Sequence, residues 1–191
     1  FTKIDNFLGH FLHGLKLKSY EFNKYKSKKE KKTISIHVTG NKNKPSQQSQ
    51  IKFKALEEGT FYARDLVSEP GNILHPDEYA KRINSLRKYG LKINVYDDKK
   101  LKKLGMHALL GVGQGSIRGS YLVTMEWKGI KNNSKPLAFV GKGVCFDTGG
   151  YSLKPARFME DMTYDMAGSA AVVGLMKTLA LRKAKVNAVG V

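Results

Sequence analysis

The densest group of chemically versatile side chains lies in a glycine-rich stretch that reads GKGVCFDTGGYSLKP, at residues 141–155. It contains Lys142, Asp147 and Lys154, and a second carboxylate, Asp165, follows in the sequence YDMAGSA. Carboxylates are hard oxygen ligands for divalent cations, and one that bridges two ions holds them about 3.5–4 Å apart, as in two-metal hydrolases. A lysine ligates a metal only as the neutral amine, whereas a charged lysine stabilises negative charge on a substrate oxygen. These residue types predict a metal and substrate site; the alternative is an ordinary glycine-rich turn with surface charges.

The segments on either side of this stretch would place it at the rim of a sheet. Residues 137–140 are wholly apolar, which is typical of a buried central strand, and residues 166–182 favour a helix with small side chains at its start. Ligands of open α/β sheets gather beyond the carboxyl ends of the strands. We therefore expect Lys142 and Asp147 at such an end, with Asp165 facing the same crevice.

The rest of the chain alternates helical and strand-like patterns. Helices are expected at residues 5–17, 50–67, 75–90 and 97–104, and strands at residues 33–38, 91–96, 121–127 and 186–191. This order predicts an α/β fold with a mixed, largely parallel sheet flanked by helices. Residues 40–49 have the polar composition of a linker and mark the expected domain boundary. Residues 111–116 (GVGQGS) resemble a phosphate loop but lack the Gly-Lys-Ser/Thr ending of a P-loop, so a nucleotide site is not predicted there.

The charge balance raises the question of a nucleic-acid partner. Among the 191 residues, 34 are Lys or Arg and 16 are Asp or Glu, which gives a formal net charge of +18. The basic residues are spread over almost every segment, and spread charge supplies a field without base readout. A solvated surface is therefore favoured over a polyanion site, which remains the alternative.

Other bulk features exclude some classes of protein. With 41% hydrophobic residues the chain can build a core, and no apolar run approaches the length of a membrane span. No membrane partner and no signal peptide are expected. The single cysteine, Cys145, fits a reducing compartment and is expected to be a packed residue rather than a nucleophile.

Several stretches resemble the leucyl (cytosol) aminopeptidase family. Residues 139–155 (FVGKGVCFDTGGYSLKP) and 159–171 (MEDMTYDMAGSAA) are similar to its metal and substrate segments. Residues 63–72 (ARDLVSEPGN) are similar to the segment that opens its catalytic domain, and GVGQGS matches a further family segment. The resemblance extends over residues 5–191, and its motifs are long and specific.

The resemblance implies a role for each candidate residue. Lys142 would ligate one metal through its amine, Asp165 would ligate the same metal, and Asp147 would bridge both metals. Lys154 would polarise the scissile carbonyl and stabilise the developing oxyanion. Met162 would line the pocket for the first side chain of the substrate.

The chain departs from the family pattern in two places. Residues 167–169 are Ala-Gly-Ser instead of the usual Gly-Gly-Ala, which is a mild change. The family motif Asn-Thr-Asp-Ala-Glu-Gly-Arg is absent. That motif would supply one acidic ligand, one acid shared by both metals, and an arginine that holds bicarbonate as general base.

We therefore expect an internal fragment of a longer enzyme. Residues 1–45 would be a remnant of an N-terminal α/β domain with its linker, and residues 46–191 the N-terminal half of a metallopeptidase catalytic domain. The resemblance implies two divalent ions (Mn²⁺ or Zn²⁺), peptide substrates with leucine preferred at the N-terminus, a homohexamer and a cytoplasmic location. The fragment alone is expected to be inactive. The alternatives are a basic DNA- or polyanion-binding module and an inactive, degenerate gene product.

Overall fold

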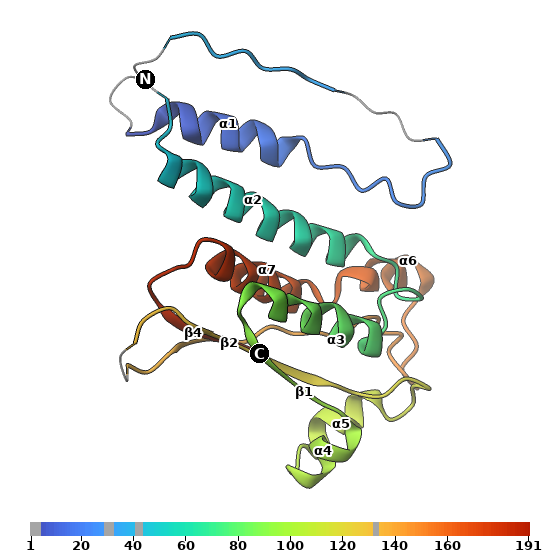
Figure 1. Ribbon diagram of the computed structural model, residues 1–191. Helices are drawn as coiled ribbons and strands as arrows, with labels where there is room; N and C mark the ends of the chain where they lie inside the picture. The colour runs from blue at the N-terminus through green and yellow to red at the C-terminus, as the bar shows by residue number, and fades with distance from the viewer. Residues whose placement is uncertain (1–4, 29–32, 41–43, 132–133) are drawn as a thin grey trace.

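The computed structural model describes residues 5–28, 33–40, 44–131 and 134–191, and its four strands form one sheet (Figure 1). The strands are β1 (Lys92–Tyr96), β2 (Leu122–Lys128), β3 (Leu137–Phe139) and β4 (Asn187–Gly190), in the spatial order β1-β2-β4-β3. The pairs β1/β2 and β2/β4 are antiparallel and β3/β4 is parallel. The mixed α/β sheet is confirmed, with one of its three described pairs parallel.

Helices pack against the sheet and against one another. They are α1 (Phe7–Lys18), α2 (Gln47–Ser68), α3 (Pro76–Asn84), α4 (Asp98–Lys103), α5 (His107–Gly113), α6 (Ala156–Met159) and α7 (Ala167–Leu181), with 3₁₀ turns η1 (Ser85–Tyr89) and η2 (Glu160–Tyr164). Figure 1 shows α3 and α7 next to the sheet, α2 packed on α7, and α1 outermost on α2. No helix among the described residues is long and apolar enough to cross a membrane.

The core lies between the sheet and α7. Helix α7 is apolar on most sides because it is enclosed by β2 and β4 on one face and by α2 on the other. Its Val173 and Met176 are almost fully buried, together with Ile93 of β1 and Met125 of β2. This packing fixes the start of α7, which is the part of the helix nearest to the candidate site.

Two glycines allow α2 and α7 to approach closely. A Cβ atom at Gly59 would lie 2.0 Å from Thr178 Oγ1 and 2.5 Å from the Gly174 carbonyl oxygen. A Cβ atom at Gly174 would lie 2.6 Å from the Gly59 carbonyl oxygen. The two helix backbones therefore touch at this crossing, and no larger side chain fits.

Replacing Gly59 with alanine is expected to destabilise the protein by about 3 kcal/mol, because overpacking at a closed helix crossing forces the backbones apart. Gly14 on α1 is the matched control, since a Cβ atom there meets nothing within 4 Å. Gly14→Ala should stabilise the protein by about 0.5–1 kcal/mol through helix propensity. Denaturant unfolding followed by circular dichroism measures both changes, and equal effects of the two variants would contradict this account of the crossing.

One strand prediction was wrong, and a second strand was predicted correctly but at the wrong position in the sheet. The strand expected at residues 33–38 is irregular, extended chain that pairs with no strand in the described part of the structure, and Ile34 is 81% exposed. Alternation of apolar and polar residues favours a strand only where a neighbouring strand can accept its hydrogen bonds. Residues 137–140 were expected at the centre of the sheet, but β3 is an edge strand here and Val140 is 79% exposed.

Helix boundaries also differ from the expectation. Helix α2 begins at Gln47, inside the expected linker, because the Ser46 hydroxyl caps it by accepting a hydrogen bond from the Ser49 backbone N–H at 3.2 Å. Helix α5 includes residues 111–113 of the GVGQGS stretch, where no helix was expected. Helix α6 and turn η2 were not predicted. The domain boundary at residue 45 stays a prediction.

Candidate functional site

The glycine-rich stretch leaves β3 and runs directly against the start of α7. The Gly141 backbone N–H donates to the Val191 carbonyl oxygen at 2.9 Å, and the Ser169 N–H donates to the Lys142 carbonyl oxygen at 2.9 Å. A Cβ atom at Gly141 would lie 2.5 Å from Ser169 Cα, so only glycine permits this approach. The backbone of Lys142 is thereby held beside the residues that begin α7.

Lys142 and Asp165 form the first pair of the site. The Lys142 ammonium lies 2.7 Å from Asp165 Oδ1, at the point where η2 ends and α7 is about to begin. The other carboxylate oxygen, Asp165 Oδ2, is buried and has no hydrogen-bond partner. A buried carboxylate oxygen without a donor is costly, and a cation is the usual partner that removes this cost. The orphaned oxygen therefore fits a metal ligand.

Asp147 and Lys154 form the second pair. The Lys154 ammonium lies 3.8 Å from Asp147 Oδ2, while Asp147 Oδ1 accepts a hydrogen bond from the Gly149 N–H at 2.8 Å. The Lys154 backbone N–H donates to the Thr148 carbonyl oxygen at 2.9 Å and closes the turn formed by residues 148–154. The turn itself depends on Gly149, whose φ is +91°. This closed turn brings Lys154 back beside Asp147.

Replacing Gly149 with alanine is expected to open this turn. Its Cβ atom would lie 2.2 Å from the Ser152 carbonyl oxygen, in addition to the cost of a positive φ. Gly150→Ala is the matched control, because Gly150 also has a positive φ (+64°) but a Cβ atom there meets nothing within 4 Å. Amide hydrogen exchange of residues 146–154 should accelerate about 5- to 150-fold more in Gly149→Ala than in Gly150→Ala, since a steric clash of this kind costs about 1–3 kcal/mol. Equal exchange in the two variants would show that the clash does not matter.

The structure brings the four charged candidates together as two separate pairs. Within the described residues, no hydrogen bond or ion pair joins the Lys142–Asp165 pair to the Asp147–Lys154 pair. Met162 is half-buried in η2, and its backbone carbonyl accepts a hydrogen bond from the Asp165 N–H at 3.3 Å. The neighbouring Asp161 is exposed.

Cys145 lies inside the same glycine-rich stretch but is packed in the core. It is 7% exposed and belongs to the hydrophobic core. Burial, with a smaller contribution from the negative charge of Asp77, raises the pKa of the Cys145 thiol to about 12. The thiol is therefore protonated near neutral pH, as expected of a packed cysteine.

The residues present fit part of a metal shell. One amine and two carboxylates are suitable ligands, and Asp165 Oδ2 has unused capacity. Among the residues that the structure describes, no group of three or more His, Cys, Asp or Glu side chains is close enough to hold an ion. Further ligands are therefore needed to complete a site for two ions.

Sequence reasoning missed the residues that support the site from behind. The Tyr79 hydroxyl on α3 is hydrogen-bonded to Ser169 Oγ at 2.9 Å, and Ser169 Oγ also donates to the Met166 carbonyl oxygen at 2.8 Å. Burial raises the pKa of the Tyr79 hydroxyl far above its ordinary value, so it remains a neutral hydrogen-bonding group. Tyr79 and Ser169 are 90 residues apart, and no local pattern signals that they meet.

Residues 61–191 match the family model described as the cytosol aminopeptidase family, catalytic domain. This chain belongs to the cytosol aminopeptidase family. All four charged residues of the two pairs, and Met162, lie within the matched region. The resemblance of the glycine-rich stretch to this family is thereby confirmed.

Relatives and solved structures agree with this assignment. The chain is 51% identical over 188 residues to a probable cytosol aminopeptidase of Brucella ovis and 49% identical over 183 residues to one of Caulobacter vibrioides. It covers 37% of each of these relatives, and each match includes 93% of the chain.

Two solved structures are similar in fold. The first is the bottromycin maturation enzyme BotP in complex with Mn, with 31% identity, a TM-score of 0.81, and coverage of 95% of this chain and 38% of that one. The second is a cytosol aminopeptidase from Coxiella burnetii, with 25% identity, a TM-score of 0.79, and coverage of 98% and 39%. The chain therefore spans well under half the length of the family members that it matches.

Proposed function

We propose that the protein to which this chain belongs is a metal-dependent aminopeptidase that releases N-terminal residues from peptides, with leucine preferred. The observation that carries this proposal is the match of residues 61–191 to the catalytic domain of the cytosol aminopeptidase family. The two Lys–Asp pairs supply a chemical reason for it, because they combine metal ligands with a cation able to face a substrate oxygen.

Lys142, Asp165 and Asp147 are the residues that would hold the metal ions. Asp165 contributes a buried oxygen that lacks a hydrogen-bond donor, and Lys142 lies directly beside that carboxylate. Two Mn²⁺ or Zn²⁺ ions would supply Lewis-acid activation of water and of the substrate carbonyl. Manganese is supported by the similar BotP structure, which is described as a complex with Mn.

The remaining residues would bind and orient the peptide. Lys154 follows a turn that its backbone N–H closes by donating to the Thr148 carbonyl, and its ammonium would stabilise negative charge that develops on the scissile carbonyl oxygen. Met162, half-buried in η2 next to Asp165, would contact the first side chain of the substrate. Bicarbonate as general base, a homohexameric assembly and a cytoplasmic location complete the proposal, and the family resemblance supports them.

The proposal is tested with the full-length protein and leucine p-nitroanilide in the presence of Mn²⁺. We expect hydrolysis that is lost on chelation and restored by Mn²⁺. N-acetyl-leucine p-nitroanilide is the control, because an aminopeptidase requires the free α-amine. Equal hydrolysis of the acetylated substrate, or none of either substrate in metal-loaded protein, would refute an aminopeptidase.

The 191-residue chain by itself is expected to be inactive in the same assay. Its described residues contain no cluster of three His, Cys, Asp or Glu side chains that could hold an ion, so Lys142, Asp147 and Asp165 would lack the further ligands for two ions. Hydrolysis by the isolated chain that disappears in Asp147→Ala would contradict this expectation.

A further inference from the structure

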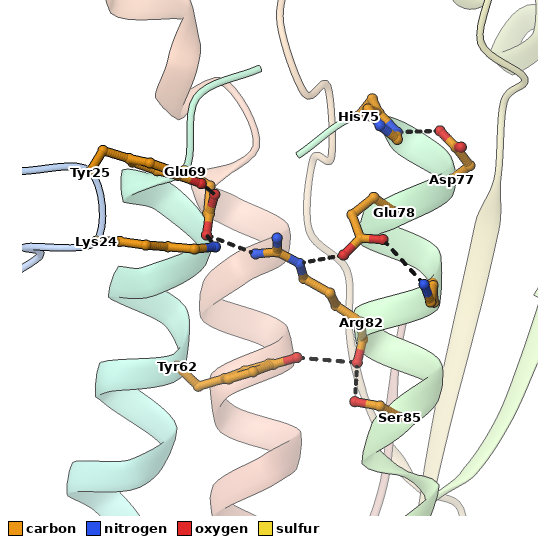
Figure 2. Close-up of polar contacts among 10 residues, drawn as sticks. Lys24, Tyr25, Tyr62, Glu69, His75, Asp77, Glu78, Arg82 and Ser85 are labelled. Carbon is orange, nitrogen blue, oxygen red and sulfur yellow. Dashed lines mark hydrogen bonds and ion pairs between the residues drawn. The ribbon is translucent and has the colours of Figure 1, made fainter. Parts of the chain in front are cut away.

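A buried carboxylate, Glu69, lies at the end of α2 and is held by groups from two separate parts of the chain, residues 24–25 and α3 (Figure 2). Its side chain is 2% exposed. Oε1 lies 2.5 Å from the Lys24 ammonium and 3.1 Å from Arg82 NH1, and Oε2 accepts a hydrogen bond from the Tyr25 hydroxyl at 2.5 Å. We call Glu69 with Lys24, Tyr25 and Arg82 the Glu69 clasp. It does not belong to either Lys–Asp pair.

The negative charge of Glu69 is buried, and ion pairs with Lys24 and Arg82 and a hydrogen bond from Tyr25 compensate it. Burial by itself would raise the pKa of Glu69, but the hydrogen bonds from Lys24, Tyr25 and Arg82 outweigh it and hold the pKa below its ordinary value. Glu69 is therefore ionised near neutral pH. Loss of the charge leaves three donors with a weaker acceptor, so the clasp loosens as a unit.

The first connection from the Glu69 clasp to the glycine-rich stretch is through the turn that follows Glu69. The Ile73 and Leu74 N–H groups both donate to the Pro70 carbonyl oxygen at 2.9 Å, which makes residues 70–74 a tight turn. A Cβ atom at Gly71 would lie 3.0 Å from Phe146 Cβ, so the Phe146 side chain packs directly on the Gly71 backbone. Phe146 is the residue before Asp147. A displacement of the turn therefore reaches Asp147 through one packed contact.

The second connection is through α3. Arg82 of the clasp also donates from Nε to Glu78 Oε1 at 2.9 Å, which fixes its guanidinium along α3. The same helix carries Tyr79, whose hydroxyl is hydrogen-bonded to Ser169. Ser169 in turn donates through its N–H to the Lys142 carbonyl and through its hydroxyl to the Met166 carbonyl. A shift of α3 would therefore reach the backbone of Lys142 and that of Met166, the residue after Asp165.

The segment that supplies Lys24 and Tyr25 is fastened along α2. The Arg64 guanidinium donates to the Leu17 carbonyl oxygen at 2.7 Å, and the Tyr20 hydroxyl donates to Asp65 Oδ1 at 2.9 Å. Residues 17–25 therefore run beside the C-terminal half of α2 and end on Glu69. This segment precedes the region matched to the catalytic domain, which begins at residue 61.

We propose that Glu69 is a positioning residue for the metal site, and that residues 17–25 complete the site from outside the catalytic domain by neutralising Glu69. The inference rests on the proposed function only for the identity of the site. The clasp holds the 70–74 turn and α3, and these hold the two segments that carry Asp147 and the Lys142–Asp165 pair. Weakening the clasp lowers metal affinity without removing a ligand.

The test uses the full-length protein and three variants. Glu69→Gln removes the charge, and Tyr25→Phe removes one hydrogen bond and serves if Glu69→Gln does not fold. Glu57→Gln is the matched control, because Glu57 is an acid of α2 that also meets an N-terminal residue, His13, at 3.0 Å. Among the described residues, it makes no hydrogen bond or ion pair with α3 or the 70–74 turn. Mn²⁺ binding to metal-free protein is measured by titration calorimetry, without substrate. Amide exchange of residues 143–154 is measured in the same metal-free samples.

We expect Glu69→Gln to weaken Mn²⁺ binding about 10-fold or more, within the range for residues that orient metal ligands from behind. Tyr25→Phe should weaken it less, and Glu57→Gln should leave it unchanged. Exchange of residues 143–154 should be faster in Glu69→Gln and in Tyr25→Phe than in Glu57→Gln, whereas exchange in β1 and β2 should be equal in all three. Wild-type Mn²⁺ affinity with unchanged exchange of residues 143–154 in both clasp variants would overturn the inference.

Failure of the proposed function has a different signature. If the wild-type protein binds no Mn²⁺ and cleaves no peptide, the metallopeptidase assignment fails. The exchange measurement still decides whether Glu69 positions the loop, since it needs no metal. A general loss of protection across all strands and helices, equal in the clasp variants and in Glu57→Gln, would show a merely structural role and would also overturn the inference.

Discussion

Lys154→Ala in the full-length protein is expected to lower kcat for leucine p-nitroanilide about 10²–10³-fold, which is typical of losing one group that stabilises an oxyanion. Metal content should not change, because Lys154 carries a positive charge and lies beside Asp147 without replacing it as a ligand. Steady-state kinetics and elemental analysis of the purified variant measure the two quantities. The loss should appear mainly in kcat, since the interaction is strongest when the oxygen is negatively charged.

Lys99→Ala is the control for a change in overall charge. Lys99 is exposed on α4, far along the chain from the two Lys–Asp pairs, and should have wild-type kinetics. A Lys154→Ala variant that loses its metal would assign Lys154 to metal binding instead. One that retains wild-type kcat would remove it from the site.

Asp165→Ala is expected to abolish Mn²⁺ binding at the position shared with Lys142. The loss should exceed the ~10–100-fold seen for residues that only orient ligands, because a ligand itself is removed. The stability of the metal-free protein should hardly fall, since Asp165 Oδ2 has no hydrogen-bond donor to lose and the partner of Oδ1 is an exposed ammonium. Titration calorimetry and thermal unfolding of the metal-free protein measure these two effects.

Asp161→Ala is the matched control for this prediction. It is an acid in η2, the short helical turn that ends just before Asp165, and its side chain is exposed. Wild-type Mn²⁺ affinity is expected for Asp161→Ala. If both variants bind Mn²⁺ equally well, Asp165 is not a ligand, and its orphaned oxygen needs another explanation.

The two Lys–Asp pairs are held by structural supports of different kinds. Lys142 and Asp165 are placed by helix packing, because their segments are fixed against the start of α7 and through Ser169 against α3. Lys154 is placed by a glycine turn, which depends on the backbone of Gly149. Substitutions in the core are therefore expected to affect the Lys142–Asp165 pair most, and substitutions in the turn to affect Lys154.

Local patterns predicted most of the regular elements correctly. Helices α2 and α7 were predicted from the spacing of their apolar residues, and strands β1 and β2 from the alternation of apolar and polar residues. In each element, buried and exposed positions recur with the period of that element. The same reasoning failed for residues 33–38, where alternation was present but a partner strand was not among the described residues. It failed for the surroundings of β3, because an apolar composition does not say which strands lie on either side.

The sequence by itself determined the family and the candidate residues, because the glycine-rich motif is long and its residue types are adjacent in the chain. Only the tertiary structure decided that Lys142 meets Asp165 while Lys154 meets Asp147, and that Asp165 keeps a buried oxygen without a donor. It also decided that Glu69, 44 and 45 residues from Tyr25 and Lys24, is neutralised by a distant segment. The physical reason is that helix and strand patterns record burial of each residue, whereas ion pairs depend on which segments packing brings together.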